Sequence, residues 1–279
     1  MGKIPEQWTA HLLSPFRYPG GKSWFLPHAK KWFANSQKDT DTIVEPFAGG
    51  GIITLTAIIN DYIQKGIMVE LDTDIASVWQ TILHEEDSKK LVRKIADFNF
   101  NVENVIEIIQ GTQDDRLSNA FRTIIKNRVN RAGILAPGAG KIKLGEKSKG
   151  LSSRWYAETL VKRIDKIHDY RNRLSFIHGD AFQVMKNKAY DNKRTKFFID
   201  PPYYEAGKRL YTHNDIDHAE LFSIAKGLKA QFLMTYDNQE GIRALANNNA
   251  LPYSYVEMKN SHHQPKKELI ISSNLDWIN

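Results

Sequence analysis

Residues 196–204 read KFFIDPPYY, and this stretch says most about the fold of the chain. Phe197–Ile199 is an apolar run of residues that favour β-structure, and it ends on the carboxylate of Asp200. A buried strand of this kind places its last residue at the carboxyl edge of a parallel sheet, where ligands bind in open α/β folds. Pro201 and Pro202 cannot continue a central strand, so we expect the chain to leave the sheet there.

The turn after this strand places hydrogen-bond acceptors beside an aromatic ring. The Asp200 carboxylate and the Pro201 carbonyl can both accept, and Tyr203 follows closely. Two acceptors next to an aromatic plane fit a planar group that carries an amine, such as a nucleobase. An incidental aspartate in a strand-to-loop turn is the alternative interpretation.

The composition limits the size and class of the protein. With 279 residues, 41% of them hydrophobic, we expect one large domain or a core with a smaller lobe. No apolar run approaches the roughly 18 residues of a membrane-spanning helix, so no membrane association is expected. The N-terminus lacks the pattern of a signal peptide, and we expect a cytoplasmic protein. The absence of cysteine excludes disulfides, thiolate catalysis and cysteine-based metal sites.

Positive charge is concentrated in one internal region. Residues 116–173 hold fifteen basic and four acidic side chains, a net charge of +11 against +7 for the whole chain, so the remainder is net acidic. This distribution predicts a lobe that binds a polyanion. The candidates for DNA contacts are Arg122, Lys126, Arg128, Arg131, Lys141, Lys143 and Arg154. For any single one of them, a solvated helix face is the alternative.

The same part of the chain has helical periodicity. From about residue 75 to residue 172 apolar residues recur at helical spacing, and Phe121, Ile124, Ile125 and Val129 predict one apolar stripe. Trp155 is a candidate either for the core or for a wedge at an extruded base. The pattern predicts a helical, basic insert over residues 75–173, between two parts of another domain, residues 1–74 and 174–279.

A glycine turn and a spaced acid predict a nucleoside site. An apolar strand leads into Phe47-Ala48-Gly49-Gly50-Gly51 and then into an apolar helix, and glycines let the backbone approach a ligand closely. A second strand ends on Glu70. The number of residues between Gly49 and this acid is close to the number in Rossmann-type folds, where such an acid binds the ribose hydroxyls. Asp72 and Asp74 are nearby alternatives. A third strand ends near Asp180, which fits a turn cap as well as a ligand contact.

These motifs resemble those of the Dam-type adenine-specific DNA methyltransferases. Residues 200–203, DPPY, resemble the catalytic motif in which the aspartate and the next carbonyl bind the amine of a flipped base that stacks on the tyrosine. Residues 16–22, FRYPGGK, resemble the N-terminal cofactor motif, although a plain helix start is an alternative. The resemblance covers about residues 16–74 and 176–272, and the insert matches by position only.

The resemblance implies a Rossmann-like S-adenosylmethionine-dependent methyltransferase sheet with a mostly helical target-recognition insert. It implies S-adenosylmethionine as cofactor, and the residues that it assigns to cofactor binding are Tyr18, Lys22, Phe47, Gly49, Glu70, Asp180 and Asp200. The residues that it assigns to catalysis are Asp200, Pro201 and Tyr203. No metal is expected to take part.

The activity that the resemblance implies is transfer of a methyl group to the 6-amino group of adenine in duplex DNA, with the base flipped out of the helix. An RNA adenine methyltransferase and a catalytically silent DNA-binding module are the alternatives. Duplex DNA is the expected partner. A cognate restriction enzyme is the second candidate partner, and a monomer or weak dimer is the expected state.

Overall fold

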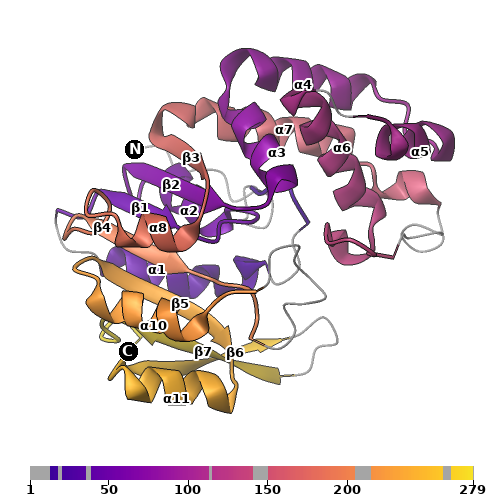
Figure 1. Ribbon diagram of the computed structural model, residues 1–279. Coiled ribbons are helices and arrows are strands. Elements are labelled where there is room, and N and C mark those ends of the chain that lie inside the picture. The colour runs from indigo at the N-terminus through magenta and orange to yellow at the C-terminus, as the bar shows by residue number, and fades with distance from the viewer. Residues whose placement is uncertain are drawn as a thin grey trace.

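The computed structural model of the chain describes residues 13–17, 21–35, 39–112, 115–140, 150–204, 215–259 and 265–278. In these residues seven strands form one sheet in the order β3-β2-β1-β4-β5-β7-β6 (Figure 1). The strands are β1 (Thr42–Glu45), β2 (Lys65–Glu70), β3 (Leu174–His178), β4 (Thr195–Ile199), β5 (Gln231–Asp237), β6 (Tyr253–Lys259) and β7 (Pro265–Ser272).

Helices lie on both sides of this sheet and in a separate group at one end of it. The helices beside the sheet are α1 (Leu26–Ala34), α2 (Ile52–Ile59), α8 (Ala181–Lys186), α10 (His218–Gly227) and α11 (Glu240–Asn248). Between β2 and β3 the chain forms α3 (Thr73–Leu83), α4 (Glu85–Asp97), α5 (Val102–Gln110), α6 (Arg116–Val129) and α7 (Ala157–Asp169). We call α3 to α7 the helical region. Short 3₁₀ turns occur at Lys22–Phe25, Arg131–Gly133, Leu151–Arg154 and Arg171–Arg173.

The order of the strands creates a ligand site between β1 and β4. β1 pairs in parallel with β2 on one side and with β4 on the other, with Val44 opposite both Ile67 and Phe197. The chain therefore winds outward in both directions from this point, and ligands of open α/β sheets bind at the carboxyl ends of the strands there. β7 runs antiparallel to β5 and closes the far side of the sheet with β6. The predicted Rossmann-like α/β fold is confirmed.

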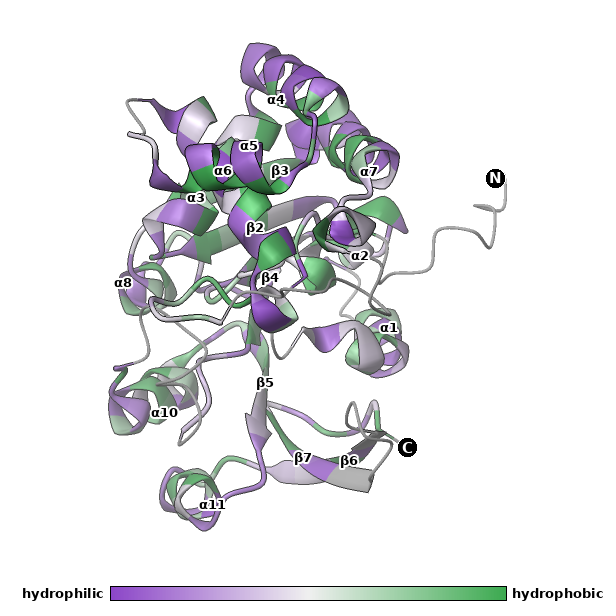
Figure 2. Ribbon diagram, turned by 90° about the vertical axis from the view of Figure 1, so that its right-hand side faces the viewer, coloured by the Kyte–Doolittle hydropathy of each residue, from purple (hydrophilic) through white to green (hydrophobic). Residues whose placement is uncertain are grey.

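Alternating side chains of the central strands fill two apolar cores. Phe198 points to one face, where its ring lies 5.9 Å from Phe25 and 6.5 Å from Trp32 of α1. Phe197 and Ile199 point to the other face and join the cluster that α8, α10 and α11 cover. Every residue of β4 is buried, as expected for a strand with helices on both sides. Figure 2 shows mostly hydrophilic residues along α4 at the top of the molecule.

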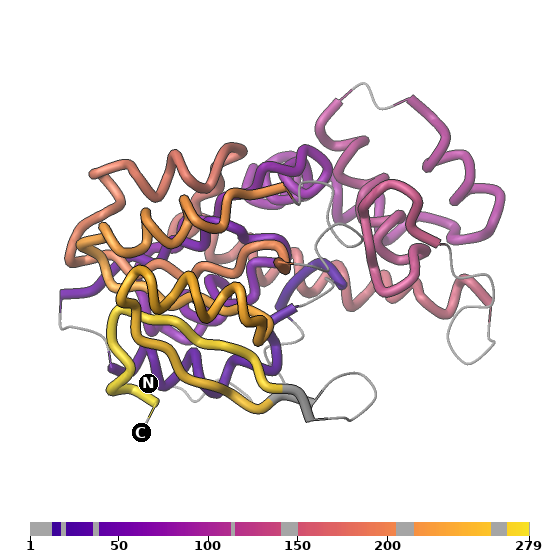
Figure 3. Tube along the Cα trace, turned by 60° about the horizontal axis from the view of Figure 1, so that its bottom comes forward, coloured from indigo at the N-terminus to yellow at the C-terminus, as the bar shows by residue number. Residues whose placement is uncertain are grey.

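The helical region shares its core with the sheet. α3 packs against both β3 and α6, and one apolar cluster includes Ile43 of β1 together with Ile124 and Ile164 of the helical region. The predicted apolar stripe of α6 is buried, which confirms it. Trp155 stacks on Phe100 at 4.7 Å, so its ring packs inside this region. Figure 3 shows the helical region standing beyond the sheet as a lobe. The boundaries at 74/75 and 173/174 stay a prediction.

None of the helices in the described part of the chain has the length and hydrophobicity needed to span a membrane.

Candidate active site

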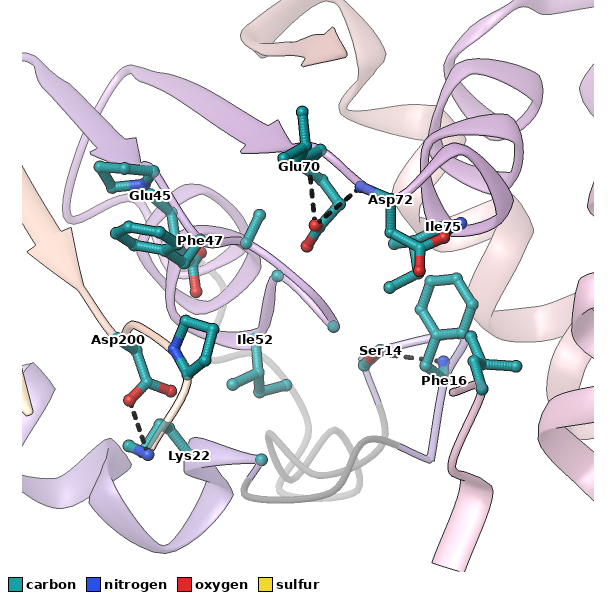
Figure 4. Close-up of a pocket in the computed structure, with 18 of the residues that line it drawn as sticks. Ser14, Phe16, Lys22, Glu45, Phe47, Ile52, Glu70, Asp72, Ile75 and Asp200 are labelled. Carbon is teal, nitrogen blue, oxygen red and sulfur yellow. Dashed lines mark hydrogen bonds and ion pairs between the residues drawn. The ribbon is translucent and has the colours of Figure 1, made fainter. Parts of the chain in front are cut away.

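Four neighbouring strands end around one cavity of about 700 Å³. Its wall contains Glu45 from the end of β1, Glu70 from the end of β2, Asp180 after β3 and Asp200 after β4 (Figure 4). Parallel strands bring their carboxyl ends to the same edge, so residues far apart in the sequence converge there. The helical region supplies the opposite wall of the cavity, which includes Leu160.

One oxygen of Asp200 is held by two donors. Thr235 Oγ1 donates a hydrogen bond of 2.7 Å to Asp200 Oδ1, and Lys22 Nζ lies 2.8 Å from the same oxygen. The pairing of β4 with β5 sets Ile199 opposite Met234, so the next residues, Asp200 and Thr235, lie side by side. No donor among the described residues bonds to Oδ2, and Figure 4 shows this second oxygen turned toward the cavity. Asp200 therefore keeps one acceptor oxygen for a ligand.

Lys22, which we predicted to contact the cofactor, lines the cavity but is bonded to the predicted catalytic aspartate. Its side chain is only 3% exposed, and Nζ also lies 3.9 Å from Oε2 of the buried Glu268. Its assignment to the cofactor stays a prediction. Tyr18 falls outside the described residues.

Tyr203 lies beside Lys22, whose Nζ is 5.5 Å from the centroid of the tyrosine ring. Burial raises the pKa of the Tyr203 hydroxyl, and the carboxylates of Glu268, Asp200 and Asp237 raise it further, so the hydroxyl stays protonated at neutral pH. Of the DPPY residues, Asp200 and Pro202 belong to the described cavity wall, whereas Pro201 and Tyr203 do not. The predicted stacking of a base on Tyr203 stays a prediction.

Glu70 ties the glycine turn to the end of β2. Its Oε2 accepts a hydrogen bond of 3.0 Å from Gly49 N, and its Oε1 accepts from Leu71 N at 2.9 Å and from Asp72 N at 3.1 Å. These bonds leave one lone pair of Oε2 for a ligand hydroxyl. Burial raises the pKa of Glu70, while the hydrogen bonds oppose this. The alternative acid, Asp72, uses its carboxylate to cap α3.

The glycine turn itself requires residues without a side chain. Gly49 has φ +45° and Gly51 has φ +61°, values that L-residues rarely adopt. A Cβ on Gly51 would come within 2.7 Å of Met68 Sδ and 2.9 Å of Trp79 Cζ2. Trp79 Nε1 also donates to the Gly49 carbonyl at 2.9 Å. The turn is thus fixed by packing before any ligand binds.

Phe47 and Asp180, both predicted to contact the cofactor, line the cavity. The Phe47 ring packs edge-on against Phe182, with the centroids 6.5 Å apart. Asp180 caps α8 by accepting hydrogen bonds from Phe182 N at 2.6 Å and Gln183 N at 3.0 Å. The cap that we considered as an alternative for Asp180 is therefore present, and the residue faces the cavity as well.

The residues of this cavity fit S-adenosylmethionine. An aromatic ring at Phe47, a hydroxyl acceptor at Glu70 and the carboxylate of Asp200 suit an adenine, a ribose and a sulfonium cation respectively. Glu45 is 3% exposed, and its Oε2 accepts a hydrogen bond of 3.0 Å from Thr54 N. Burial raises the pKa of Glu45 to about 8, and the nearby charge of Asp200 contributes.

The described residues that we predicted to contact DNA are either accessible or buried. Arg122 and Lys126 are 22% and 24% exposed and bind Asp74 at 3.3 and 3.2 Å. Arg131 is exposed, whereas Lys141 and Lys143 fall outside the described residues. Arg122, Lys126 and Arg131 are accessible, and their contacts with DNA stay a prediction.

Arg128 and Arg154 are buried, so neither lies on the outer surface of the helical region, and their contacts with DNA stay a prediction. Arg128 Nη2 donates to the Pro15 carbonyl at 2.9 Å, and Arg154 Nε donates to the Arg128 carbonyl at 3.2 Å. Both guanidinium groups therefore hold backbone, and Arg128 also lines the cavity.

Sequence reasoning missed how the helical region holds residues 14–17, which we call the strap. The side chain of Asn127, 1% exposed, accepts from Arg17 N and donates to the carbonyls of Arg17 and Gly133, each at 2.8 Å. Arg163 Nη1 donates to the Ser14 carbonyl at 3.0 Å. Ser14, Phe16 and Arg17 line the cavity, and Figure 4 shows Ser14 and Phe16 on the side opposite Asp200. The sequence signal for this contact was Asn127, a polar amide three residues after Ile124 and beside the apolar stripe of α6.

Comparison with solved structures gives distant likenesses to methyltransferases. The methyltransferase TrmK of M. capricolum, in complex with S-adenosylhomocysteine, is 7% identical with a TM-score of 0.40, over 89% of this chain and 68% of that chain. A putative RNA methyltransferase from Pyrococcus horikoshii is 10% identical with a TM-score of 0.40, over 97% and 89%. The rRNA methyltransferase aviRa from Streptomyces viridochromogenes is 12% identical with a TM-score of 0.40, over 97% and 93%.

Comparison of sequences is more specific. No curated protein matches the chain. The family model of the D12 class N6 adenine-specific DNA methyltransferases matches residues 18–264, a range that contains the glycine turn, the helical region and the DPPY strand. The chain belongs to the D12 class N6 adenine-specific DNA methyltransferase family, and its cofactor is S-adenosylmethionine.

Proposed function

We propose that this protein methylates the 6-amino group of adenine in duplex DNA, and that the target base is flipped out of the helix into the cavity. The observation that carries this proposal is the carboxylate of Asp200, which has one oxygen held by Thr235 and Lys22 and the other turned into the cavity. Membership of the family supports methyl transfer to adenine.

When bound, S-adenosylmethionine supplies an electrophilic methyl group, whose bond to the positive sulfur breaks, leaving the electron pair on sulfur, as the bond to nitrogen forms. Asp200 Oδ2 accepts one hydrogen of the amine and the Pro201 carbonyl accepts the other. With both hydrogens held, the nitrogen lone pair turns out of conjugation with the ring. Tyr203 stacks on the base, and the surplus proton leaves the nitrogen through Asp200 Oδ2 to solvent.

The helical region is the proposed DNA-binding surface. It contains most of residues 116–173, whose net charge is +11, and it forms the wall of the cavity that faces Asp200. Arg131 is exposed, and Arg122 and Lys126 are partly exposed on α6. Basic side chains placed beside the cavity hold phosphates of the duplex. Asp200 lies at the edge of the sheet, so an adenine amine inside the helix reaches it only after the base is extruded.

The test is transfer of labelled methyl from S-adenosylmethionine to bacterial genomic DNA that lacks adenine methylation. The control is Asp200→Ala, and total RNA serves as competitor. We expect label in DNA adenine with the native protein and none with the variant. Label in RNA alone would overturn the DNA assignment while keeping the chemistry. Transfer that survives Asp200→Ala would overturn the mechanism.

A further inference from the structure

A second side chain acts on the predicted catalytic carboxylate. Thr235 is 1% exposed and lies in the middle of β5, between β4 and β7. It is opposite Ile270 of β7 and next to Asp200 across the sheet. Its hydroxyl donates to Asp200 Oδ1 at 2.7 Å, the shorter of the two bonds to that oxygen. Thr235 does not belong to the described wall of the cavity, so it reaches a ligand only through Asp200.

We propose that Thr235 is a positioning residue for methyl transfer, which fixes the rotation of the Asp200 carboxylate so that Oδ2 alone meets the adenine amine. This inference rests on the proposed function. A carboxylate has two equivalent oxygens and rotates about its last side-chain bond over a broad range of angles. A bond to Oδ1 from a donor that cannot move removes this freedom and sets the direction of the Oδ2 lone pairs.

Lys22 alone cannot fix this rotation. An ammonium group is a point charge on a flexible four-carbon stem and attracts either oxygen of a carboxylate. A second carboxylate, Glu268, lies 3.9 Å from Lys22 Nζ and draws the lysine away from Asp200. The side chain of Thr235 is branched at Cβ, and its strand is hydrogen-bonded on both sides. Lys22 thus attracts the Asp200 carboxylate, while Thr235 orients it.

A purely structural role for Thr235 makes a different prediction. In that case the hydrogen bond only satisfies two polar groups in a tight place, and its loss lowers the stability of the protein without changing the chemistry of the folded fraction. Two variants distinguish these roles: one keeps the shape of the side chain, and the other keeps its hydroxyl. Valine replaces the hydroxyl by a methyl group, and serine keeps the hydroxyl.

The experiment compares Thr235→Val and Thr235→Ser with the native protein. The matched control is Thr81→Val, because Thr81 is also fully buried and its hydroxyl has no hydrogen-bond partner among the described residues. Three quantities are measured: the single-turnover rate of methyl transfer at saturating DNA and S-adenosylmethionine, the affinity for S-adenosylmethionine, and the melting temperature. The substrate is the nucleic acid that the native protein methylates.

We expect Thr235→Val to slow the single-turnover rate by about tenfold to a hundredfold, as small misplacements of reacting groups do. Its affinity for S-adenosylmethionine should be unchanged. Thr235→Ser should recover most of the rate, and Thr81→Val should keep it. A folded Thr235→Val protein with the native rate overturns the inference while the proposed function stands, and so does a folded serine variant as slow as the valine variant. No transfer by the native protein to DNA or RNA overturns both.

Discussion

Glu45 should make the stability of the folded protein fall as the pH rises. This residue ends β1 inside the cavity, is 3% exposed, and accepts a hydrogen bond from Thr54 N. Burial raises the pKa of its carboxyl group from 4.5 to about 8, and the charge of Asp200 adds to the effect. The perturbation that isolates this group is Glu45→Gln, which keeps the size and an acceptor for Thr54 N but never ionises.

The magnitude follows from the difference between the two pKa values. Below pH 4.5 the carboxyl group is protonated in the folded and the unfolded chain, so it costs nothing. Between pH 4.5 and about 8 the unfolded chain releases a proton that the folded chain retains, and the free energy of unfolding falls by about 1.4 kcal/mol per pH unit. The accumulated loss is about 5 kcal/mol, and it is constant above the folded pKa.

Urea unfolding of the native protein and of Glu45→Gln, at intervals from about pH 5 to about pH 9, measures this effect. Every other titrating group contributes to both proteins, so the difference between their free energies of unfolding isolates Glu45. We expect this difference to move in favour of the glutamine variant as the pH rises and to level off near pH 8. A difference that stays flat would show that Glu45 is ionised in the folded protein and would refute the reasoning.

Two further predictions concern the glycine turn and the DNA surface. Gly51→Ala forces a Cβ to within 2.7 Å of Met68 Sδ, so the free energy of unfolding should fall by about 2–4 kcal/mol in thermal melts. The control Gly138→Ala also has a positive φ, +80°, but open space around the Cβ, so it should lose less. Equal losses would contradict the packing argument. Arg131 is exposed, so Arg131→Ala should weaken DNA binding and reduce the salt dependence of binding by about one counterion. Arg154 is buried, so Arg154→Ala should instead lower the melting temperature. An unchanged salt dependence for Arg131→Ala would remove that residue from the proposed DNA-binding surface.

The sequence predicted the strand and turn features of the site because local patterns encode them. An apolar run that stops at Asp200, and a glycine run before an apolar helix, constrain the backbone within a few residues, and the structure has both. The accessibility of the basic residues is not encoded in this way. Arg128 and Arg131 look alike in a helical pattern, but Arg131 is exposed, whereas Arg128 is buried and donates to the carbonyl of Pro15, 113 residues away.

The same limit applies to contacts across the sheet. The contact of Thr235 with Asp200 depends on the register that sets Ile199 opposite Met234, which no local pattern specifies. Lys22 was assigned to the cofactor from its motif, and its bond to Asp200 arises from the folded arrangement of segments far apart in the chain. Pairings of this kind depend on tertiary structure, which propensity and periodicity do not specify.

The three hydrogen bonds of Asn127 limit how freely the helical region can be exchanged between relatives. Under the proposed function, a change of target sequence would require grafting the helical region of another enzyme onto this sheet. We expect such a graft to need an amide at this position of the new α6, and the strap transplanted with it as part of the same module. The natural unit of exchange is therefore discontinuous in the gene: it joins residues 14–17 to the helices that begin more than fifty positions later.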